Sequence, residues 1–217
     1  MERVPAERQP DSRGDASHPP TDPARFEEMY AGAPPWDIGR PQPAFLRLAE
    51  AGQLRGRVLD VGCGTGEHAL MAARLGLPTV GIDAAPTAIE RAAEKAKARN
   101  LAVRFQVWNA LKLRDLGEQF DTVLDSGLLH VFDDAERARF VDALRAVVPP
   151  GGRYYLLCFS DQQPGDLGPR RLSQEEIRAC FATGWRVDSI EAAAFEVNLG
   201  PAFATAAQAW LATITRT

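Results

Sequence analysis

The sequence predicts an α/β fold, a doubly wound sheet of seven strands that is mostly parallel and carries an antiparallel C-terminal edge strand. Strand-like apolar runs alternate with amphipathic helical segments, a pattern typical of a parallel sheet with helices on both faces. The last two apolar runs, 185–197 and 208–217, are close together and can pair antiparallel at one edge. The 217 residues are enough for one sizeable hydrophobic core.

Five apolar runs are expected to form the parallel strands. "RVLDVG" comes first and ends at a glycine-rich turn, whereas the second and third runs end in the polar residues Asp83 and Asn109. Ligands of such sheets bind beyond the carboxyl ends of the strands, so these three endings mark the expected site. The five runs are 57–62, 78–83, 103–109, 120–127 and 153–160.

The helices between the strands start at recognisable caps. Pro86 lies near the first turn of the helix after the second strand. Asp133 or Asp134 can cap the helix that "PPGG" terminates, and Ser173 with Glu176 forms a capping-box pattern. The predicted helices are 26–30, 43–52, 67–76, 86–100, 133–148 and 173–181.

One domain, 23–217, is expected after a disordered tail, 1–22, that is rich in Pro, Asp, Arg and Ser. The chain has no apolar segment typical of a signal peptide, and no run near the roughly 18 apolar residues that span a bilayer. A cytoplasmic protein without a membrane partner is therefore expected. The net charge of −4, with lysines and arginines scattered among acids, argues against a nucleic-acid partner. We expect a monomer or a weak homodimer.

Metal sites and disulfides are not expected. The three cysteines, Cys63, Cys158 and Cys180, form no C-x-x-C pair, and histidines are few. Asp125 and Asp161 each follow a strand and could bind Mg²⁺, but no third oxygen ligand is apparent. The sequence therefore predicts chemistry without a metal.

The turn after the first strand, "LDVGCGTGEH" (59–68), has glycines at alternate positions. A dinucleotide site has the spacing G-x-G-x-x-G and holds a pyrophosphate at the helix N-terminus. Here the spacing is G-x-G-x-G and Glu67 follows, whose charge would repel a pyrophosphate. The ligand is therefore expected to lack phosphates. The residues expected to approach it are Gly62, Cys63, Gly64 and Gly66.

Polar residues at the strand ends complete the expected site. Asp83, 17 residues after Gly66, can accept hydrogen bonds from both hydroxyls of a ribose. Asn109 could pair with an adenine edge or simply hold a turn. Asp60, inside the first strand, is costly to bury unpaired, so a ligand ammonium or backbone N–H groups are expected to satisfy it. The other residues expected in the cofactor site are Ala84, Ala110, Leu111 and Asp125.

A ribose, an adenine-like ring, no phosphates and a possible amine together describe S-adenosylmethionine. The sequence also resembles the class I S-adenosylmethionine-dependent methyltransferases over about residues 40–217. The resemblance implies a Rossmann-like methyltransferase fold and S-adenosylmethionine as cofactor, although an Asp is usual where Asn109 stands. It is carried by "VLDVGCGTGE" (58–67), "GIDAAPTAI" (81–89), "WNAL" (108–111), "FDTVLDSGLLH" (120–130) and "PPGGRYYLL" (149–157).

The proline-rich stretch "PPWDIGRPQP" lies in a helical segment, 23–52, that is expected to be a lid over the cofactor. Trp36 or Tyr30 could place an aromatic face near the sulfonium, and Arg40 could hold the methionyl carboxylate. The alternative is a rigid linker whose Trp36 fills a gap in the core. The stretch resembles the "PWDxGR" segment of the thiol, halide and thiopurine methyltransferases. The whole chain is similar to small actinobacterial methyltransferases of heteroaromatic compounds.

The latter resemblance implies a small, flat methyl acceptor, methylated at nitrogen or oxygen in secondary metabolism or detoxification. A thiol or halide is the alternative acceptor, and a cofactor-binding module without turnover is the alternative to an enzyme. His130, after the fourth strand, is the best candidate for a general base, with a packing histidine as an equally weighted interpretation. His68 is expected to be a surface or capping residue. The residues expected to bind the acceptor are Tyr30, Trp36, His130 and Phe159.

Overall fold

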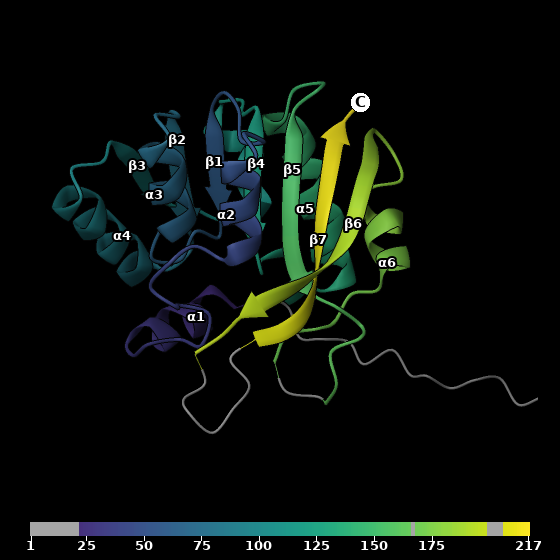
Figure 1. Ribbon diagram of the computed structural model, residues 1–217, viewed down its shortest axis with the longest axis horizontal. Coiled ribbons are helices and arrows are strands. Elements are labelled where there is room, and N and C mark those ends of the chain that lie inside the picture. Colours follow the sequence, from purple (N-terminus) through teal and green to yellow (C-terminus); the bar gives the residue numbers. More distant parts are fainter. Residues whose placement is uncertain (1–21, 166–167, 199–205) are drawn as a thin grey trace, which may run out of the picture.

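One seven-stranded sheet organises the computed structural model, which describes residues 22–165, 168–198 and 206–217. The strand order is β3-β2-β1-β4-β5-β7-β6, and β7 alone runs antiparallel to its neighbours (Figure 1). Of the predicted tail, all but Asp22 lies outside the described residues. The strands are β1 (Val58–Val61), β2 (Thr79–Asp83), β3 (Val103–Val107), β4 (Thr122–Ser126), β5 (Arg153–Phe159), β6 (Trp185–Glu196) and β7 (Ala206–Arg216).

The predicted fold class is confirmed, with one difference at the antiparallel end. The C-terminal strand β7 is antiparallel as expected, but it lies between β5 and β6, so β6 is the edge. Residues 209–212 of β7 are all buried, whereas β6 exposes Arg186, Asp188 and Glu191. A strand that is apolar on both faces gains more from an inside position, and a charged strand is suited to an edge.

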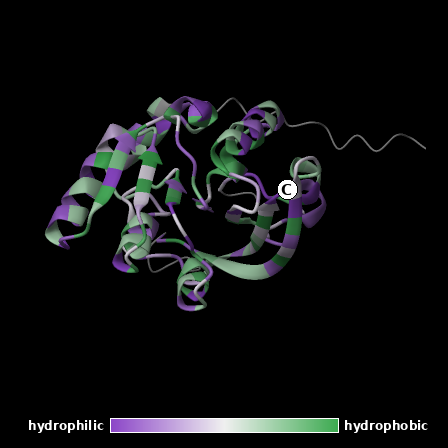
Figure 2. Ribbon diagram, turned by 90° about the horizontal axis from the view of Figure 1, so that it is seen from above, coloured by the Kyte–Doolittle hydropathy of each residue, from purple (hydrophilic) through white to green (hydrophobic). Residues whose placement is uncertain are grey.

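Helices cover both faces of the sheet, and β5 separates the two cores. Tyr154 and Leu156 pack in the core under α5 and α6, whereas Tyr155 and Leu157 pack in the core under α2 and α3. Figure 2 shows hydrophilic and hydrophobic residues along the helices, as expected of amphipathic helices on a sheet. The helices are α1 (Pro23–Tyr30), α2 (Pro43–Glu50), α3 (Glu67–Arg74), α4 (Pro86–Ala98), α5 (Asp134–Val147) and α6 (Gln174–Cys180), with the 3₁₀ segments η1 (Ala110–Leu116) and η2 (Leu129–Val131).

The predicted caps are confirmed. Asp133 with Glu136 and Ser173 with Glu176 each form a complete capping box at the start of α5 and α6. Such caps satisfy backbone N–H groups that the helix leaves free, and each typically contributes about 1 kcal/mol.

The carboxyl ends of the parallel strands all point toward α1 (Figure 1). The long strands β6 and β7 extend beyond β5 and curve beneath the other strand ends toward the same place (Figure 1). The fold therefore brings the N-terminal segment, the glycine-rich turn and the end of β6 together at one end of the sheet.

Candidate functional site

The backbone of the glycine-rich turn has a conformation that residues with side chains rarely adopt. The φ angles are +65° at Gly62, +52° at Gly64 and +84° at Gly66, in the left-handed region that favours glycine. Space is limiting as well, because a Cβ on Gly66 would lie 2.7 Å from the Phe105 ring and 2.9 Å from Ala92. Gly66 is thus required by helix–strand packing in addition to any ligand.

Asp83, at the end of β2, fixes this turn. Its Oδ2 accepts a hydrogen bond from Gly64 N at 2.8 Å, and its Oδ1 accepts one from Ala85 N at 2.9 Å. Burial raises the pKa of the carboxyl. Each carboxylate oxygen has further acceptor capacity, so Asp83 can still accept hydrogen bonds from the two hydroxyls of a ribose.

Asp60, in β1, lies beside the turn and is only 1% exposed. Its Oδ2 accepts a hydrogen bond from Ala69 N at 2.9 Å, but its Oδ1 is buried without a partner among the described residues. Burial raises the pKa of the carboxyl to about 8. Because buried polar atoms are normally paired, this oxygen is the expected partner of a ligand donor such as an ammonium group.

The N-terminal segment folds over the turn. Trp36 Nε1 donates a hydrogen bond to Tyr30 Oη at 2.9 Å, and that hydroxyl lies 2.7 Å from where a Cβ on Gly64 would stand. Thr65 Oγ1 donates to Asp37 Oδ1 at 2.9 Å, which fastens the proline-rich link to the turn. Tyr30 and Trp36, both predicted site residues, therefore lie directly against the predicted cofactor loop.

Arg40 points elsewhere. Its side chain is 57% exposed, and its guanidinium forms an ion pair with Glu196 at the end of β6. The contact with a methionyl carboxylate expected of Arg40 would require this pair to open. A surface ion pair of this kind contributes little, about 0–1 kcal/mol, so exchange of partners would cost little.

Gln42 and His68 form a junction that the sequence analysis missed. Gln42 Nε2 donates to Glu196 O at 2.9 Å, Glu196 N donates to Gln42 Oε1 at 2.8 Å, and Gln42 N donates to His68 Nε2 at 3.0 Å. His68 is buried, contrary to the expectation of a surface residue, because this hydrogen bond and the ring of Phe45 enclose it. Burial lowers its pKa to about 4.

His130, the predicted base, is buried in η2. Its Nδ1 accepts a hydrogen bond from Phe159 N at 3.0 Å, and its ring packs edge-on against the Phe159 ring. A neutral imidazole has one acceptor nitrogen, and here it is already used. Burial lowers the pKa of His130 to about 3. These contacts favour the interpretation as a packing histidine.

Asp125, predicted as a cofactor ligand, lies inside β4 and is buried. Its carboxylate accepts hydrogen bonds from Leu128 N at 2.7 Å, from Leu129 N at 3.1 Å and from Tyr154 Oη at 2.6 Å. Burial raises its pKa to about 7. Its role in these contacts is to hold the η2 turn, whose Leu128 would lie 3.2 Å from a Cβ on Gly62.

The residues predicted around an adenine lie at the end of β3. Asn109 Oδ1 accepts a hydrogen bond from Leu111 N at 2.8 Å and caps η1. Of the two roles considered for Asn109, the structure shows the one in which its side-chain oxygen holds a turn. Ala84, Ala110 and Leu111 are half-buried beside these strand ends.

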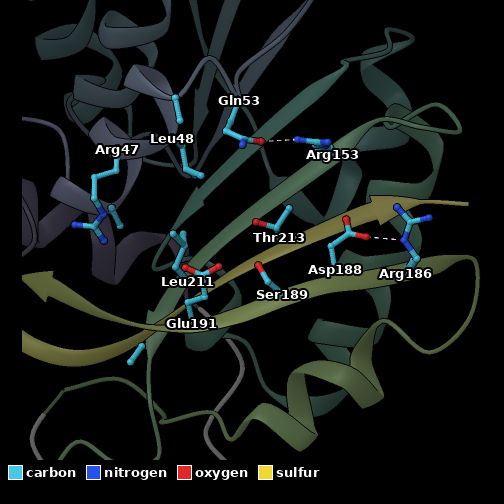
Figure 3. Close-up of a pocket in the computed structure, with 13 residues that line it drawn as sticks. Arg47, Leu48, Gln53, Arg153, Arg186, Asp188, Ser189, Glu191, Leu211 and Thr213 are labelled. Carbon is cyan, nitrogen blue, oxygen red and sulfur yellow. Dashed lines mark hydrogen bonds and ion pairs between the residues drawn. The ribbon is translucent and has the colours of Figure 1, made fainter.

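Two hollows in the structure are candidates for the ligand-binding site. A narrow cleft of about 50 Å³ is lined by six of the predicted residues, Tyr30, Trp36, Arg40, Gly62, Cys63 and Gly64. A hollow of about 470 Å³ between α2 and the β5-β7-β6 side contains none of the predicted residues (Figure 3). Polar groups of the larger hollow pair with one another, as Gln53 with Arg153 and Arg186 with Asp188 (Figure 3). We therefore assign the chemistry to the smaller cleft. Among the lining residues of this cleft that the sequence did not predict are Ser126 and Phe195.

The described part of the chain has neither a cluster of metal-ligand side chains nor a membrane-spanning helix. No group of three His, Cys, Asp or Glu residues there could hold a metal ion, and Asp161 Oδ1 accepts a hydrogen bond from Trp210 Nε1 at 3.2 Å. None of the helices among the described residues is long and apolar enough to cross a membrane.

Comparisons with known proteins agree with this geometry. A family model described as a methyltransferase domain matches residues 58–152. The chain is 38% identical over 174 residues to the 2-heptyl-1-hydroxyquinolin-4(1H)-one methyltransferase of Mycobacteroides abscessus, a match that covers 79% of this chain and 77% of that protein. It is 31% identical over 148 residues to probable thiol methyltransferase 2 of Arabidopsis thaliana, covering 67% and 66%.

Solved structures give the same result for the fold. One, from a study of the conversion of a disulfide bond into a thioacetal group during echinomycin biosynthesis, superposes with a TM-score of 0.82 at 37% identity, over 90% of this chain and 93% of that one. A SAM-dependent methyltransferase from Anabaena variabilis ATCC 29413 has a TM-score of 0.75 at 16% identity, over 93% and 97%, and so shares the fold.

Proposed function

Because this chain belongs to the S-adenosylmethionine-dependent methyltransferases, we propose that it methylates an oxygen or nitrogen of a small heteroaromatic or phenolic molecule. The observation that carries the proposal is the 38% identity, over most of both chains, to a protein named for a hydroxyquinolone acceptor. The aromatic residues Trp36 and Phe195 in the cleft support a flat acceptor. Methylation of a thiol is the second candidate, which the Arabidopsis relative favours.

Two acids beside the cleft, Asp60 and Asp83, fit the cofactor. We infer that the unpaired Oδ1 of Asp60 accepts from the methionyl ammonium and that Asp83 accepts from the ribose. The Tyr30 hydroxyl stands where a side chain of Gly64 would be, so a ligand that displaces Tyr30 can approach this backbone closely. When bound, S-adenosylmethionine supplies a methyl group attached to a positively charged sulfur. The acceptor's electron pair forms the new bond to the methyl carbon, the carbon–sulfur bond breaks, and the sulfur leaves as a neutral thioether.

The chain's own contribution is alignment and exclusion of water. Holding the acceptor in line with the reacting bond can supply about 7–11 kcal/mol of the barrier. The two histidines near the cleft, His68 and His130, already use their acceptor nitrogen in hydrogen bonds from the protein. Glu67 is held in ion pairs with Lys95 and Arg99. We therefore expect the acceptor to react as its anion, which favours acidic hydroxyls such as those of N-hydroxy heterocycles and phenols.

The segment that covers the turn is proposed to open when ligands enter. The cleft of about 50 Å³ is smaller than a nucleoside, and Tyr30 and Trp36 of this segment line it. We therefore expect α1 and the proline-rich link to move aside. This supports the predicted lid at 23–52.

Incubation with labelled S-adenosylmethionine and a panel of acceptors tests the proposal. The panel contains 1-hydroxyquinolin-4-ones, quinolones, phenols, thiophenol and iodide. We expect methylated hydroxyquinolones or phenols, with a rate that follows the ionisation of the acceptor. Methylation of thiols alone would transfer the proposal to the second candidate, and calorimetric binding of the cofactor without any product would indicate a binding module.

A further inference from the structure

Three aromatic rings meet where β4, β5 and β6 end. The ring centroids of Phe159 and Phe195 are 5.3 Å apart, and the His130 ring lies 5.3 Å from the first and 6.0 Å from the second. Phe195 is the member of this cluster that also lines the cleft, together with Ser126 from β4. Only 3% of Phe195 is exposed, so its position is defined by packing.

Gly127 lets this cluster approach the cleft. Its φ is +83°, and a Cβ there would lie 3.1 Å from both the Phe195 ring and His130 Nε2. The rings therefore pack directly on the backbone that follows β4. Because no side chain intervenes, a displacement of Phe195 would change the shape of the cleft at the part that Phe195 and Ser126 line.

Gln42 fixes the strand that carries Phe195. Its side-chain amide exchanges two hydrogen bonds with the backbone of Glu196, the next residue along β6. Its own backbone N–H is held by His68, in the first turn of the helix that follows the glycine-rich turn. Gln42 is 2% exposed, and both polar groups of its side chain are used in this junction.

We propose that Phe195 forms the floor of the acceptor site and determines which acceptors fit, and that Gln42 is a positioning residue that holds Phe195 in register with the cofactor loop. This inference rests on the proposed function and goes beyond it by naming the residues that select the acceptor. The contacts of Phe195 and Gln42 do not involve Asp83, the residue proposed to bind the ribose.

Substitution of Phe195 tests the first part. For Phe195→Leu, we expect KM for the acceptor that the wild type methylates best to rise about tenfold or more, since lost contact in an apolar pocket is worth about 10–200-fold. Binding of S-adenosylhomocysteine, measured by calorimetry, should stay within about twofold of wild type. Phe195→Ala should in addition shift the preference toward acceptors that are one ring larger. Calorimetry also reports whether each variant is folded.

Gln42→Leu tests the positioning role. The control is Glu191→Gln, at an exposed position of β6, the strand that carries Phe195. We expect Gln42→Leu to raise the acceptor KM about three- to tenfold, and to have little further effect when combined with Phe195→Leu, because coupled residues are not additive. A smaller rise in acceptor KM for Gln42→Asn than for Gln42→Leu would support the positioning role. The control should keep the acceptor KM of the wild type. A lower melting temperature with an unchanged KM would mean a purely structural glutamine and would overturn it.

The outcomes separate this inference from the proposed function. If the wild-type protein methylates nothing in the panel, both are wrong. If the wild type is active but Phe195→Leu and Phe195→Ala keep its KM and its preference among acceptors, the proposed function stands and the inference fails.

Discussion

The substitution Asp60→Asn is expected to stabilise the protein at alkaline pH and to weaken its cofactor binding. Asp60 is buried, and only one of its two carboxylate oxygens has a partner among the described residues. The amide is nearly isosteric and can keep the hydrogen bond from Ala69 N. It removes the negative charge that burial makes costly.

The magnitude follows from the pKa. Burial raises the pKa of Asp60 from 3.8 to about 8, so the folded state binds a proton that the unfolded state releases. The stability tied to this proton is present below about pH 4 and is lost as pH rises toward 8. Each pH unit costs about 1.4 kcal/mol. The wild type therefore loses about 4 kcal/mol through Asp60 between about pH 5 and pH 8, and the variant does not.

Urea unfolding at several pH values measures this difference. We expect the free energy of unfolding of Asp60→Asn, minus that of the wild type, to rise by about 4 kcal/mol from about pH 5 to pH 8. Any constant penalty for the new amide N–H groups cancels in this comparison. Asp115→Asn, at an exposed position, is the control and should give a flat line. A flat line for Asp60→Asn as well would refute the reasoning.

Calorimetry with two ligands measures the effect on binding. S-adenosylhomocysteine carries the amino-acid ammonium, and 5′-methylthioadenosine lacks it. A hydrogen bond to a charged group is worth about 1.5–3 kcal/mol, so Asp60→Asn should weaken binding of the first ligand about 10- to 100-fold and leave the second unchanged. Equal weakening of both would mean that Asp60 does not face the ammonium.

Three further substitutions test the remaining assignments. Asp83→Ala should weaken S-adenosylhomocysteine and 5′-methylthioadenosine alike, by about 100-fold in calorimetry, because both carry the ribose. Gly64→Ala should destabilise the protein by about 1–3 kcal/mol in urea unfolding, since a Cβ would face Tyr30 Oη at 2.7 Å and φ is +52°. His130→Gln should leave the shape of the pH–kcat profile unchanged, because Nδ1 is already bonded to Phe159 N; loss of an ascending limb would instead identify a base.

Local features were predictable from the sequence. The glycine spacing, the acid at Asp83 and the capping boxes at Asp133 and Ser173 depend on neighbours within a few residues, so their patterns carry the information. The position of β7 was not predictable in the same way. Strand order depends on which strand is buried on both faces, and short apolar runs with an antiparallel partner are compatible with either position.

The missed site residues depend on contacts between distant parts of the chain. Gln42 pairs with Glu196, 154 positions away, and nothing next to Gln42 in the sequence indicates it. Phe195 lies in the apolar segment 185–197, whose pattern predicts a strand but no site residue. For His130, the hydrogen bond that occupies Nδ1 comes from Phe159 in β5, far away in the sequence, and only the fold reveals it.

The buried carboxyl of Asp60 destabilises the ligand-free fold when it is ionised, and the same group serves cofactor binding. A carboxylate at Asp60 costs free energy when Oδ1 has no donor, and the same oxygen gains a partner when a cation enters. A ligand that binds only the folded state adds about 2.7 kcal/mol of stability at a concentration of one hundred times its Kd. Cofactor binding and folding are therefore linked through Asp60. Variants selected for stability at alkaline pH are therefore expected to replace Asp60, and to lose affinity for the amino-acid end of the cofactor.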